Sequence, residues 1–374
     1  MASLLDLPLE VTEMVAGYLL RHDHKACAQT CRTLRAAFIP IAWSSIELGK
    51  GSAHSLPPLP SVVQAHANHI RAIHMQHGLR PHYCAIEYRQ LQSLDLQHIP
   101  YMAREEQRSL VTMAQMNSTI QDLHLSCVDL EGMQDLWETI RWTWSAPVSL
   151  SVDKINLGSS SAIDAFWLAC TRYQELQLGC ALPAPSSIVS SRLVFDHLKR
   201  LKVDSSRLVS SLRKILLASP NLEHLSLYGR LCGPPSMELV KTMQSARWKR
   251  LKSLHIHASY MADEVISDML DAVPRLTEFK LEGYGFGEQA FDSLRYRHFQ
   301  TLQTLSLDRA GGFSSEMAQE VLAHCSLLRS FSASHLCIGD FVKSSSPWTC
   351  TRLEQLKDFV VSPPERLLDA VAVR

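Results

Sequence analysis

The stretch Asn221-Leu222-Glu223-His224-Leu225-Ser226-Leu227 decides the fold, because its three leucines stand at spacings of three and two residues. The same spacing of three apolar residues, which we call a strand phrase, recurs from Ile70 almost to the C-terminus. The central residues of successive strand phrases are 21 to 32 residues apart. Its members are Ile70/Ile73/Met75, Leu91/Leu94/Leu96, Ile120/Leu123/Leu125, Val152/Ile155/Leu157, Tyr173/Leu176/Leu178, Leu198/Leu201/Val203, Leu222/Leu225/Leu227, Leu251/Leu254/Ile256, Leu276/Phe279/Leu281, Leu302/Leu305/Leu307, Leu328/Phe331/Ala333 and Leu353/Leu356. The last two positions of each member alternate with polar residues, which is typical of a strand with one buried face.

The repeat length is too short for a helical hairpin and fits one strand plus one helix per turn, which is the leucine-rich-repeat spacing. Helical stretches lie between the strand phrases, and 207–218 places Leu212, Ile215 and Leu216 on one helical face. The sequence therefore predicts an α/β fold over 70–374: a right-handed leucine-rich-repeat solenoid of about 11–12 irregular repeats. Its parallel strands should line the concave face and its helices the convex face.

Composition excludes several classes of protein. The chain has 37 basic and 37 acidic residues and a net charge of zero, which gives no electrostatic case for nucleic acid or a membrane surface. No apolar run approaches the length of a membrane span. The ten cysteines lack the paired spacing of a zinc site, and acidic residues interrupt the apolar residues of the N-terminus, unlike a signal peptide. We expect a reduced intracellular protein, cytoplasmic and/or nuclear.

Residues 1–45 differ from the rest and predict three short helices with apolar faces. Leu7-Pro8-Leu9-Glu10-Val11 opens this segment, a spaced apolar stripe and the pair Cys31-Arg32 follow, and Ala42-Trp43 closes it. This segment resembles an F-box, the helical domain that docks a Skp-family adaptor. Residues 46–69 hold two glycines and three prolines before the first strand phrase and predict a linker.

Predicted helices within 70–360 end at a breaker that the next strand follows, as at Ser219-Pro220-Asn221-Leu222 and Val273-Pro274-Arg275-Leu276. This succession of helix, proline and strand is similar to the F-box leucine-rich-repeat proteins, particularly the divergent fungal-type ones. The resemblance implies the substrate-receptor subunit of an SCF-type cullin–RING ubiquitin ligase, which holds a target protein near the ubiquitin-loaded enzyme. It also implies which residues contact the adaptor: Leu7, Pro8, Glu10, Val11, Val15, Leu19, Cys31 and Leu34. The alternative is a leucine-rich-repeat scaffold outside any ligase, whose N-terminal helices only cap the open end of the array.

The polar positions that alternate with the leucines should face away from the helices and form rows across neighbouring strands. The rows predicted for the most evenly spaced repeats are Arg200/His224/Ser253/Glu278/Thr304, Lys202/Ser226/His255/Lys280/Ser306 and Asp204/Tyr228/His257/Glu282/Asp308. Mixed charge beside a tyrosine suits a protein or peptide ligand. We predict the target-binding residues as Lys202, Tyr228, His255, His257 and Lys280, with the lysines meeting an acidic or phosphorylated segment.

Other patterns have simpler interpretations. Gly283-Tyr284-Gly285-Phe286-Gly287 stands between a strand and a helix, but Glu288 occupies the place of the third glycine of a dinucleotide loop. The histidines between His66 and His82 are dense, yet a strand would make those side chains diverge, so we predict no metal site. Trp137, Trp142 and Trp144 form either core or an exposed aromatic patch. We expect no catalytic residue, no metal, no cofactor and no enzymatic activity.

Overall fold

The computed structural model describes residues 8–48, 57–179, 182–204, 209–229, 234–246, 248–257, 261–334 and 348–357. Leu7 lies outside these residues. The chain divides into two compact units, and each is described by itself. The first comprises 1–173 with 185–189, and the second comprises 174–184 with 190–374.

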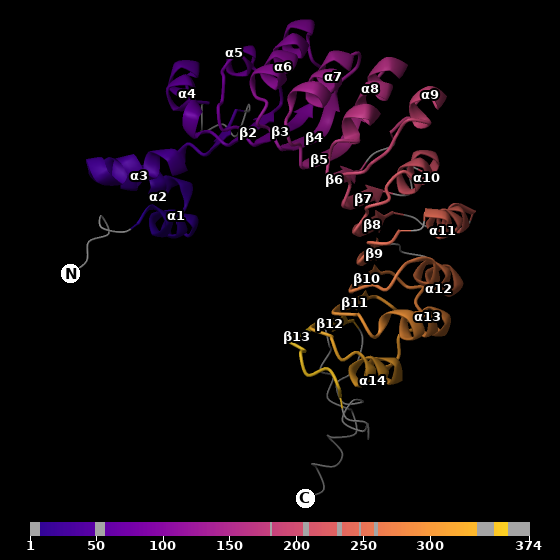
Figure 1. Cartoon of the computed structure of the whole chain (residues 1–374). Coiled ribbons are helices and arrows are strands. Elements are labelled where there is room, and N and C mark those ends of the chain that lie inside the picture. Colours follow the sequence, from indigo (N-terminus) through magenta and orange to yellow (C-terminus); the bar gives the residue numbers. More distant parts are fainter. Residues whose placement is uncertain are drawn as a thin grey trace, which may run out of the picture. The chain divides into compact units, whose positions relative to one another are not determined.

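The first unit begins with three helices and continues as strands alternating with helices (Figure 1). Its elements are α1 (Leu9–Gly17), α2 (Arg21–Thr30), α3 (Arg32–Ala42), β1 (Ser45–Glu47), α4 (Pro60–His66), the 3₁₀ turn η2 (Ala67–His69), β2 (Ala72–Gln76), α5 (Pro81–Cys84), β3 (Ser93–Ile99), α6 (Arg104–Met116), β4 (Asp122–Asp129), α7 (Gln134–Thr143), β5 (Ser149–Asn156) and α8 (Ser160–Cys170). The strands are parallel and follow the chain order from β1 to β5.

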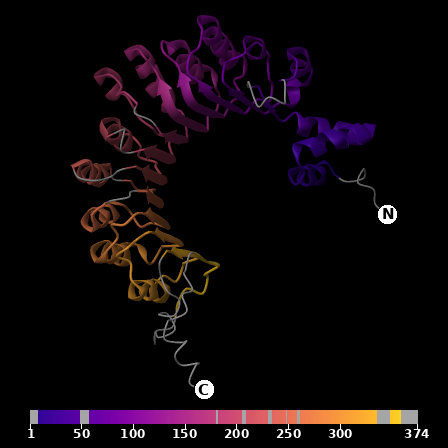
Figure 2. The same cartoon turned by 180° about the vertical axis from the view of Figure 1, so that it is seen from behind.

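The second unit repeats the same alternation, with the helices on one side of the strands (Figure 2). Its elements are β6 (Glu175–Leu178), β7 (Arg200–Asp204), α10 (Val209–Leu217), β8 (His224–Tyr228), α11 (Pro234–Ala246), β9 (Ser253–His257), α12 (Asp263–Ala272), β10 (Glu278–Glu282), α13 (Glu288–His298), β11 (Thr304–Asp308), α14 (Ser315–His324), β12 (Ser330–Ala333) and β13 (Gln355–Lys357). The short α9 (Ser187–Ser190) belongs to the first unit apart from its last residue.

Strands pair so that equivalent leucines lie side by side. Leu225 aligns with Leu201 on one side and Leu254 on the other, and Leu227 aligns with Val203 and Ile256. These side chains are buried against the helices, while the residues between them are partly exposed on the opposite side, which we call the open face. The predicted α/β leucine-rich-repeat solenoid is confirmed in this alternation of parallel strands and helices.

One predicted strand phrase is wrong. Leu123 aligns with Leu150, Leu125 with Val152, and Val128 with Ile155, so the phrase of β5 is Pro147/Leu150/Val152 and not Val152/Ile155/Leu157. The error has a physical cause. Lys154 has a positive φ of 55°, and the bend that it makes starts a second alternation at Ile155 and Leu157 that imitates the phrase.

That bend recurs at one position of the repeat. Among the described residues, five other than glycine have φ between 53° and 60°, and each stands two residues after the last apolar member of its strand phrase, as Gly229 does after Leu227. They are His77, His98, Cys127, Lys154 and Arg309. A residue with a Cβ rarely adopts this conformation, so the repeat geometry, not the residue type, imposes it.

The segment predicted as a linker, 46–69, is structured at both of its described ends. Ile46 in β1 is buried and aligns with Ile73, so the sheet begins one strand before the first predicted strand phrase. The helix α4 and the turn η2 occupy the other end. A three-residue strand offers only one alternation, which is why the periodicity did not predict it.

Polar side chains join neighbouring repeats just before several of the strands begin. The indole Nε1 of Trp144 donates to the Ala114 carbonyl at 3.0 Å, and the Thr301 hydroxyl donates to the Leu276 carbonyl at 2.7 Å. The fully buried His298 uses both ring nitrogens: Nδ1 accepts from the Leu276 N–H at 3.0 Å, and Nε2 donates to the Leu270 carbonyl at 3.2 Å. These bonds satisfy backbone groups that the repeat buries.

The stability of the fold should fall in mild acid because of His298. Burial lowers the pKa of His298 from 6.5 to about 4. As pH falls below 6.5 the unfolded chain therefore binds a proton that the folded chain does not, so this contribution is complete above pH 6.5 and lost progressively towards pH 4. We expect about 2 kcal/mol less free energy of unfolding at pH 5 than at pH 7 from this residue, measured by urea unfolding. His298→Gln should remove that part of the pH dependence, and His324→Gln, at an exposed histidine of α14, should not. Equal pH dependence in the wild type and His298→Gln would contradict this account.

Candidate functional site

The three N-terminal helices pack around a small core. Ala16 and Phe38 are buried, and the Nε2 of His24 contacts the Ala16 carbonyl at 2.9 Å while its ring lies 6.1 Å from that of Phe38. The inward face of α1 is formed by Thr12 and Ala16. Such a core is small, so apolar side chains of the helices remain partly exposed.

The predicted adaptor-binding residues lie partly on that exposed surface. Pro8 is exposed, whereas Val11, Val15 and Leu19 are half-buried, as is Leu34. The side chain of Glu10 is not described. Cys31 is exposed and begins α3, where its Sγ accepts a hydrogen bond from the Leu34 N–H at 3.5 Å.

The predicted adaptor-binding residues leave out three larger apolar side chains of α1 and of the turn that joins it to α2. Met14 is 62% exposed, Tyr18 is 91% exposed and Leu20 is 65% exposed. Tyr18 directly follows α1 and stands one helical turn after Met14, a spacing that predicts a common face. The sequence places Tyr18 on one apolar stripe with Val11, Val15 and Leu19, but a stripe alone does not say which of its members are exposed.

The open face of the second unit carries the predicted rows of polar side chains. Strand pairing aligns Arg200 with His224, Lys202 with Ser226 and Asp204 with Tyr228, and the same register continues through β9, β10 and β11. All three predicted rows are therefore confirmed as neighbours, although their role in binding stays a prediction.

An aromatic cluster occupies the centre of these rows. The ring of Tyr228 lies 5.5 Å from that of His255 and 5.8 Å from that of His257. The Nζ of Lys202 lies 4.9 Å from the centroid of the Tyr228 ring. The Tyr228 hydroxyl lies 3.4 Å from the Nδ1 of His255. Burial, Lys280 and His257 lower the pKa of His255, which favours the neutral imidazole, and its Nδ1 can then accept a hydrogen bond from that hydroxyl.

Carboxylates already pair with two of the predicted target-binding residues. The Nζ of Lys280 lies 2.5 Å from the Oε1 of Glu278, and the Nδ1 of His257 lies 2.8 Å from the Oε2 of Glu282. Burial alone would raise the pKa of Glu278, but hydrogen bonds from Lys280 and Ser253 and the charge of Lys280 bring it below its ordinary value. The predicted capture of an acidic segment by Lys280 must therefore compete with Glu278.

A second polar cluster, which the sequence analysis did not identify, lies on the open face of the first unit. His74, Asp95 and His124 align across β2, β3 and β4. The Nδ1 of His74 lies 3.0 Å from Asp95 Oδ2, and the Nε2 of His124 lies 3.9 Å from Asp95 Oδ1. Among the described residues, no group of three histidine, cysteine or acidic side chains is arranged to hold a metal ion.

The glycine-rich loop 283–287 is occupied by a side chain of the neighbouring repeat. The carboxylate of Asp263 accepts hydrogen bonds from the N–H groups of Gly287, Gln289 and Ala290 at 2.8–3.0 Å. A Cβ at Gly285 would lie 1.5 Å from the Met261 carbonyl oxygen. The glycines therefore permit close approach of the preceding repeat, and Asp263 holds the helix N-terminus where a phosphate would bind.

The tryptophan cluster divides between core and surface. Trp137 and Trp144 are fully buried, whereas Trp142 is 73% exposed with the Arg141 guanidinium 4.5 Å from its ring centroid. The core interpretation holds for the first two, and Trp142 alone remains as an exposed aromatic of this stretch.

Within the described ranges, no helix combines the length and hydropathy required to cross a bilayer.

No family model matches the chain, and no curated protein matches it. Among solved structures, a chain of the crystal structure of the yeast Rad7 and Elc1 complex is similar to it at 12% sequence identity. The likeness covers 93% of this chain and 92% of that chain, with a TM-score of 0.43. The repeat fold described above therefore rests on this chain's own strand register and burial.

Asp263 should stabilise the fold as a helix cap supplied by the preceding repeat. Asp263→Ala removes an acceptor of three hydrogen bonds, and we expect it to lower the free energy of unfolding by about 1–2 kcal/mol. Glu264→Ala is the matched control, because this exposed carboxylate stands in the same first turn of α12. Urea unfolding would measure both variants, and equal small losses would show that Asp263 does not cap α13.

Proposed function

We propose that this chain is the substrate-receptor subunit of an SCF-type cullin–RING ubiquitin ligase. Its N-terminal helices dock a Skp-family adaptor and, through it, the cullin–RING core. The open face of the repeat solenoid holds a target protein. The mechanism is proximity: tethering raises the effective concentration of target lysines near the ubiquitin-loaded enzyme.

The observation that carries the proposal is the apolar surface of α1. A helix of a self-contained bundle turns its large apolar residues inward. Here the small residues Thr12 and Ala16 face inward, while Met14 on α1 and Tyr18, which directly follows it, lie in solvent. Large exposed apolar side chains close together on a small helical unit are typical of a surface that a partner covers.

The open face of the second unit supports target binding. Tyr228 is a large side chain held between two histidines and Lys202, so binding would immobilise little additional freedom. The flanking charges are of both signs, which favours selection among protein partners more than raw affinity.

The chain itself performs no bond chemistry in this proposal. Burial raises the pKa of Cys84 to about 12 and that of Cys170 and Cys325 well above the ordinary value, so these thiols are poor nucleophiles. Both ring nitrogens of His298 form hydrogen bonds with backbone groups. These side chains serve packing and the joining of repeats.

A repeat scaffold with a helical cap remains the second candidate, and one observation favours it. The ring of Trp43, directly after α3, stacks on that of His66 at 4.3 Å, and β1 follows within two residues and pairs with β2. The N-terminal helices are thus attached to the first repeat, as a cap would be.

Adaptor binding separates the two candidates. Replacing Leu7 and Pro8 together with alanine should reduce binding of a purified Skp-family adaptor at least tenfold, as a loss of about 1.4 kcal/mol or more at the docking surface would. Co-purification and titration of the full chain would measure it, with the thermal unfolding curve as a check on folding. Tyr101→Ala is the control, because it removes an exposed aromatic outside α1–α3. Failure of the wild type to bind the adaptor would favour the scaffold, and unchanged binding by the double variant would sink the proposed docking surface.

Target capture should depend on the open face of the second unit. Tyr228→Ala, or Lys202→Glu combined with Lys280→Glu, should lower recovery of the target about tenfold or more and leave adaptor binding unchanged. Proximity labelling with the wild type and the variants side by side would measure this. Tyr296→Ala is the matched control, because Tyr296 is an exposed tyrosine on α13. If both open-face variants retain the wild-type partner set, the target binds elsewhere, and Trp142 is the next residue to test.

A further inference from the structure

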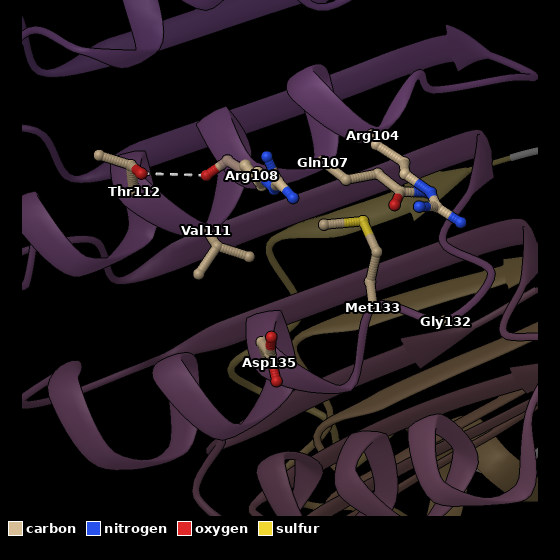
Figure 3. Close-up of a pocket in the computed structure, with 8 residues that line it drawn as sticks. All are labelled: Arg104, Gln107, Arg108, Val111, Thr112, Gly132, Met133 and Asp135. Atoms are coloured by element: carbon tan, nitrogen blue, oxygen red, sulfur yellow. Dashed lines mark hydrogen bonds between the residues drawn. The ribbon is translucent and has the colours of Figure 1, made fainter.

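A cleft of about 510 Å³ opens between α6 and α7, the helices of two adjacent repeats in the first unit (Figure 3). One wall is α6, and the other is the turn that leads into α7. The lining residues are Arg104, Gln107, Arg108, Val111, Thr112, Gly132, Met133 and Asp135. This volume is in the range of sites that take small molecules or short peptide segments.

The wall formed by α6 is a complete second face of that helix. Arg104, Gln107, Arg108 and Val111 follow the i, i+3, i+4, i+7 spacing of one helical stripe. The stripe that packs in the core is a different one, Leu110/Met113/Ala114, and it is buried. The cleft-facing stripe is therefore not needed to hold α6 on the sheet.

Two arginines of this stripe lack the carboxylate partners that three helix-borne arginines of the second unit have. In the second unit, Arg213 lies 3.5 Å from Glu238, Arg295 lies 2.9 Å from Glu320 and Arg297 lies 3.9 Å from Asp271, each joining neighbouring helices. Arg104 and Arg108 have no carboxylate within 4 Å among the described residues, although Asp135 lines the same cleft. Two guanidinium groups one turn apart thus face an open cleft without an anion.

The opposite wall supplies an apolar floor and a single charge. The apolar residues that line the cleft are the buried Met133 of this wall and the half-buried Val111 of α6. The Gln107 side chain donates to the Glu131 carbonyl at 3.5 Å and ties α6 to the turn before α7. The charges that line the cleft are those of Arg104, Arg108 and Asp135, which leave one net positive charge.

We infer that this cleft is a docking site for an acidic peptide segment of a partner protein, separate from the open face and independent of the proposed ligase function. A glutamate or aspartate carboxylate would bind the guanidinium groups of Arg104 and Arg108, which match its geometry. An aliphatic side chain next to it in the peptide would pack on Val111 and Met133, since methionine adapts to varied apolar shapes.

The single positive charge favours a carboxylate over a phosphate. A carboxylate carries one negative charge and balances the cleft, whereas a phosphorylated residue carries nearly two and would be repelled by Asp135. This charge balance is why the expected ligand is an acidic and not a phosphorylated peptide. Asp135 is the residue that selects against phosphorylated segments.

The experiment titrates the full chain with three labelled peptides that are acetylated and amidated. The first contains one glutamate flanked by leucines in a glycine-rich hexapeptide, the second has glutamine in place of the glutamate, and the third has phosphoserine there. Fluorescence anisotropy should show binding of the glutamate peptide and at least tenfold weaker binding of the glutamine peptide, because the ion pairs with both arginines are lost.

Arg104→Glu combined with Arg108→Glu should weaken binding of the glutamate peptide at least tenfold. The control is Arg89→Glu combined with Lys154→Glu, which changes the net charge equally at two exposed residues of the first unit outside the cleft. Asp135→Asn should strengthen binding of the phosphoserine peptide more than that of the glutamate peptide. Thermal unfolding of each variant checks that it is folded.

Three outcomes would overturn the inference. If the two double variants weaken binding equally, the attraction comes from net charge and not from the cleft. If the phosphoserine peptide binds the wild type more tightly than the glutamate peptide, the cleft takes phosphate. Absence of binding by the glutamate peptide at millimolar concentration would show that the cleft is not a peptide site.

Discussion

Parallel pairing in register between neighbouring repeats is the constraint on which the rest of the structure depends. A strand of this chain offers two apolar side chains to the helix side, and each is buried only because the next repeat presents its own pair at the same level. Leu225, for example, lies between Leu201 and Leu254. Burial of such a side chain contributes about 1.5–3 kcal/mol, so a repeat without its neighbour would lose much of its stability.

This constraint fixes the register of the strands but leaves the length of the helices free to vary. Helices range from the four residues of α5 to the thirteen of α6 and α11, yet the strand register does not slip. Two residues after the last apolar member of several strand phrases, the backbone takes a left-handed conformation, even on side chains as large as His98 and Arg309. Before the strand begins, buried side chains such as Trp144 and His298 join the backbone of one repeat to that of the next.

The constraint leaves two surfaces free to vary. On the open face, alternate residues are not needed for packing, and they bring together Tyr228 with two histidines in one unit and Asp95 with two histidines in the other. On the helix side, ion pairs such as Arg295 with Glu320 close the seam between neighbouring helices, and the seam between α6 and α7 stays open. Function can therefore differ between the two surfaces without a change of fold.

The sequence by itself determined the repeat, the strand positions and the rows of the open face. A period of two along a strand and a regular step between strands are local properties, and they place Lys202, Tyr228 and His257 before any contact is known. Periodicity could not recognise β1, which has only one alternation, and it misplaced the phrase of β5 because Lys154 starts a second one. It also could not place Tyr18 in solvent, since a helical stripe does not say which side has a partner.

Only the tertiary structure decided which charged groups are paired. Lys280 pairs with Glu278 two residues away on the same strand, and Asp263 reaches the helix of the next repeat. Arg104 and Arg108 have no carboxylate within 4 Å among the described residues, although Asp135 lines their cleft. The sequence gives the sign of each of these charges, but it does not say which of the charged groups lie close together. Pairing depends on distances of a few ångströms across repeats, and those distances follow from how the backbone turns between strand and helix, which composition and spacing do not encode.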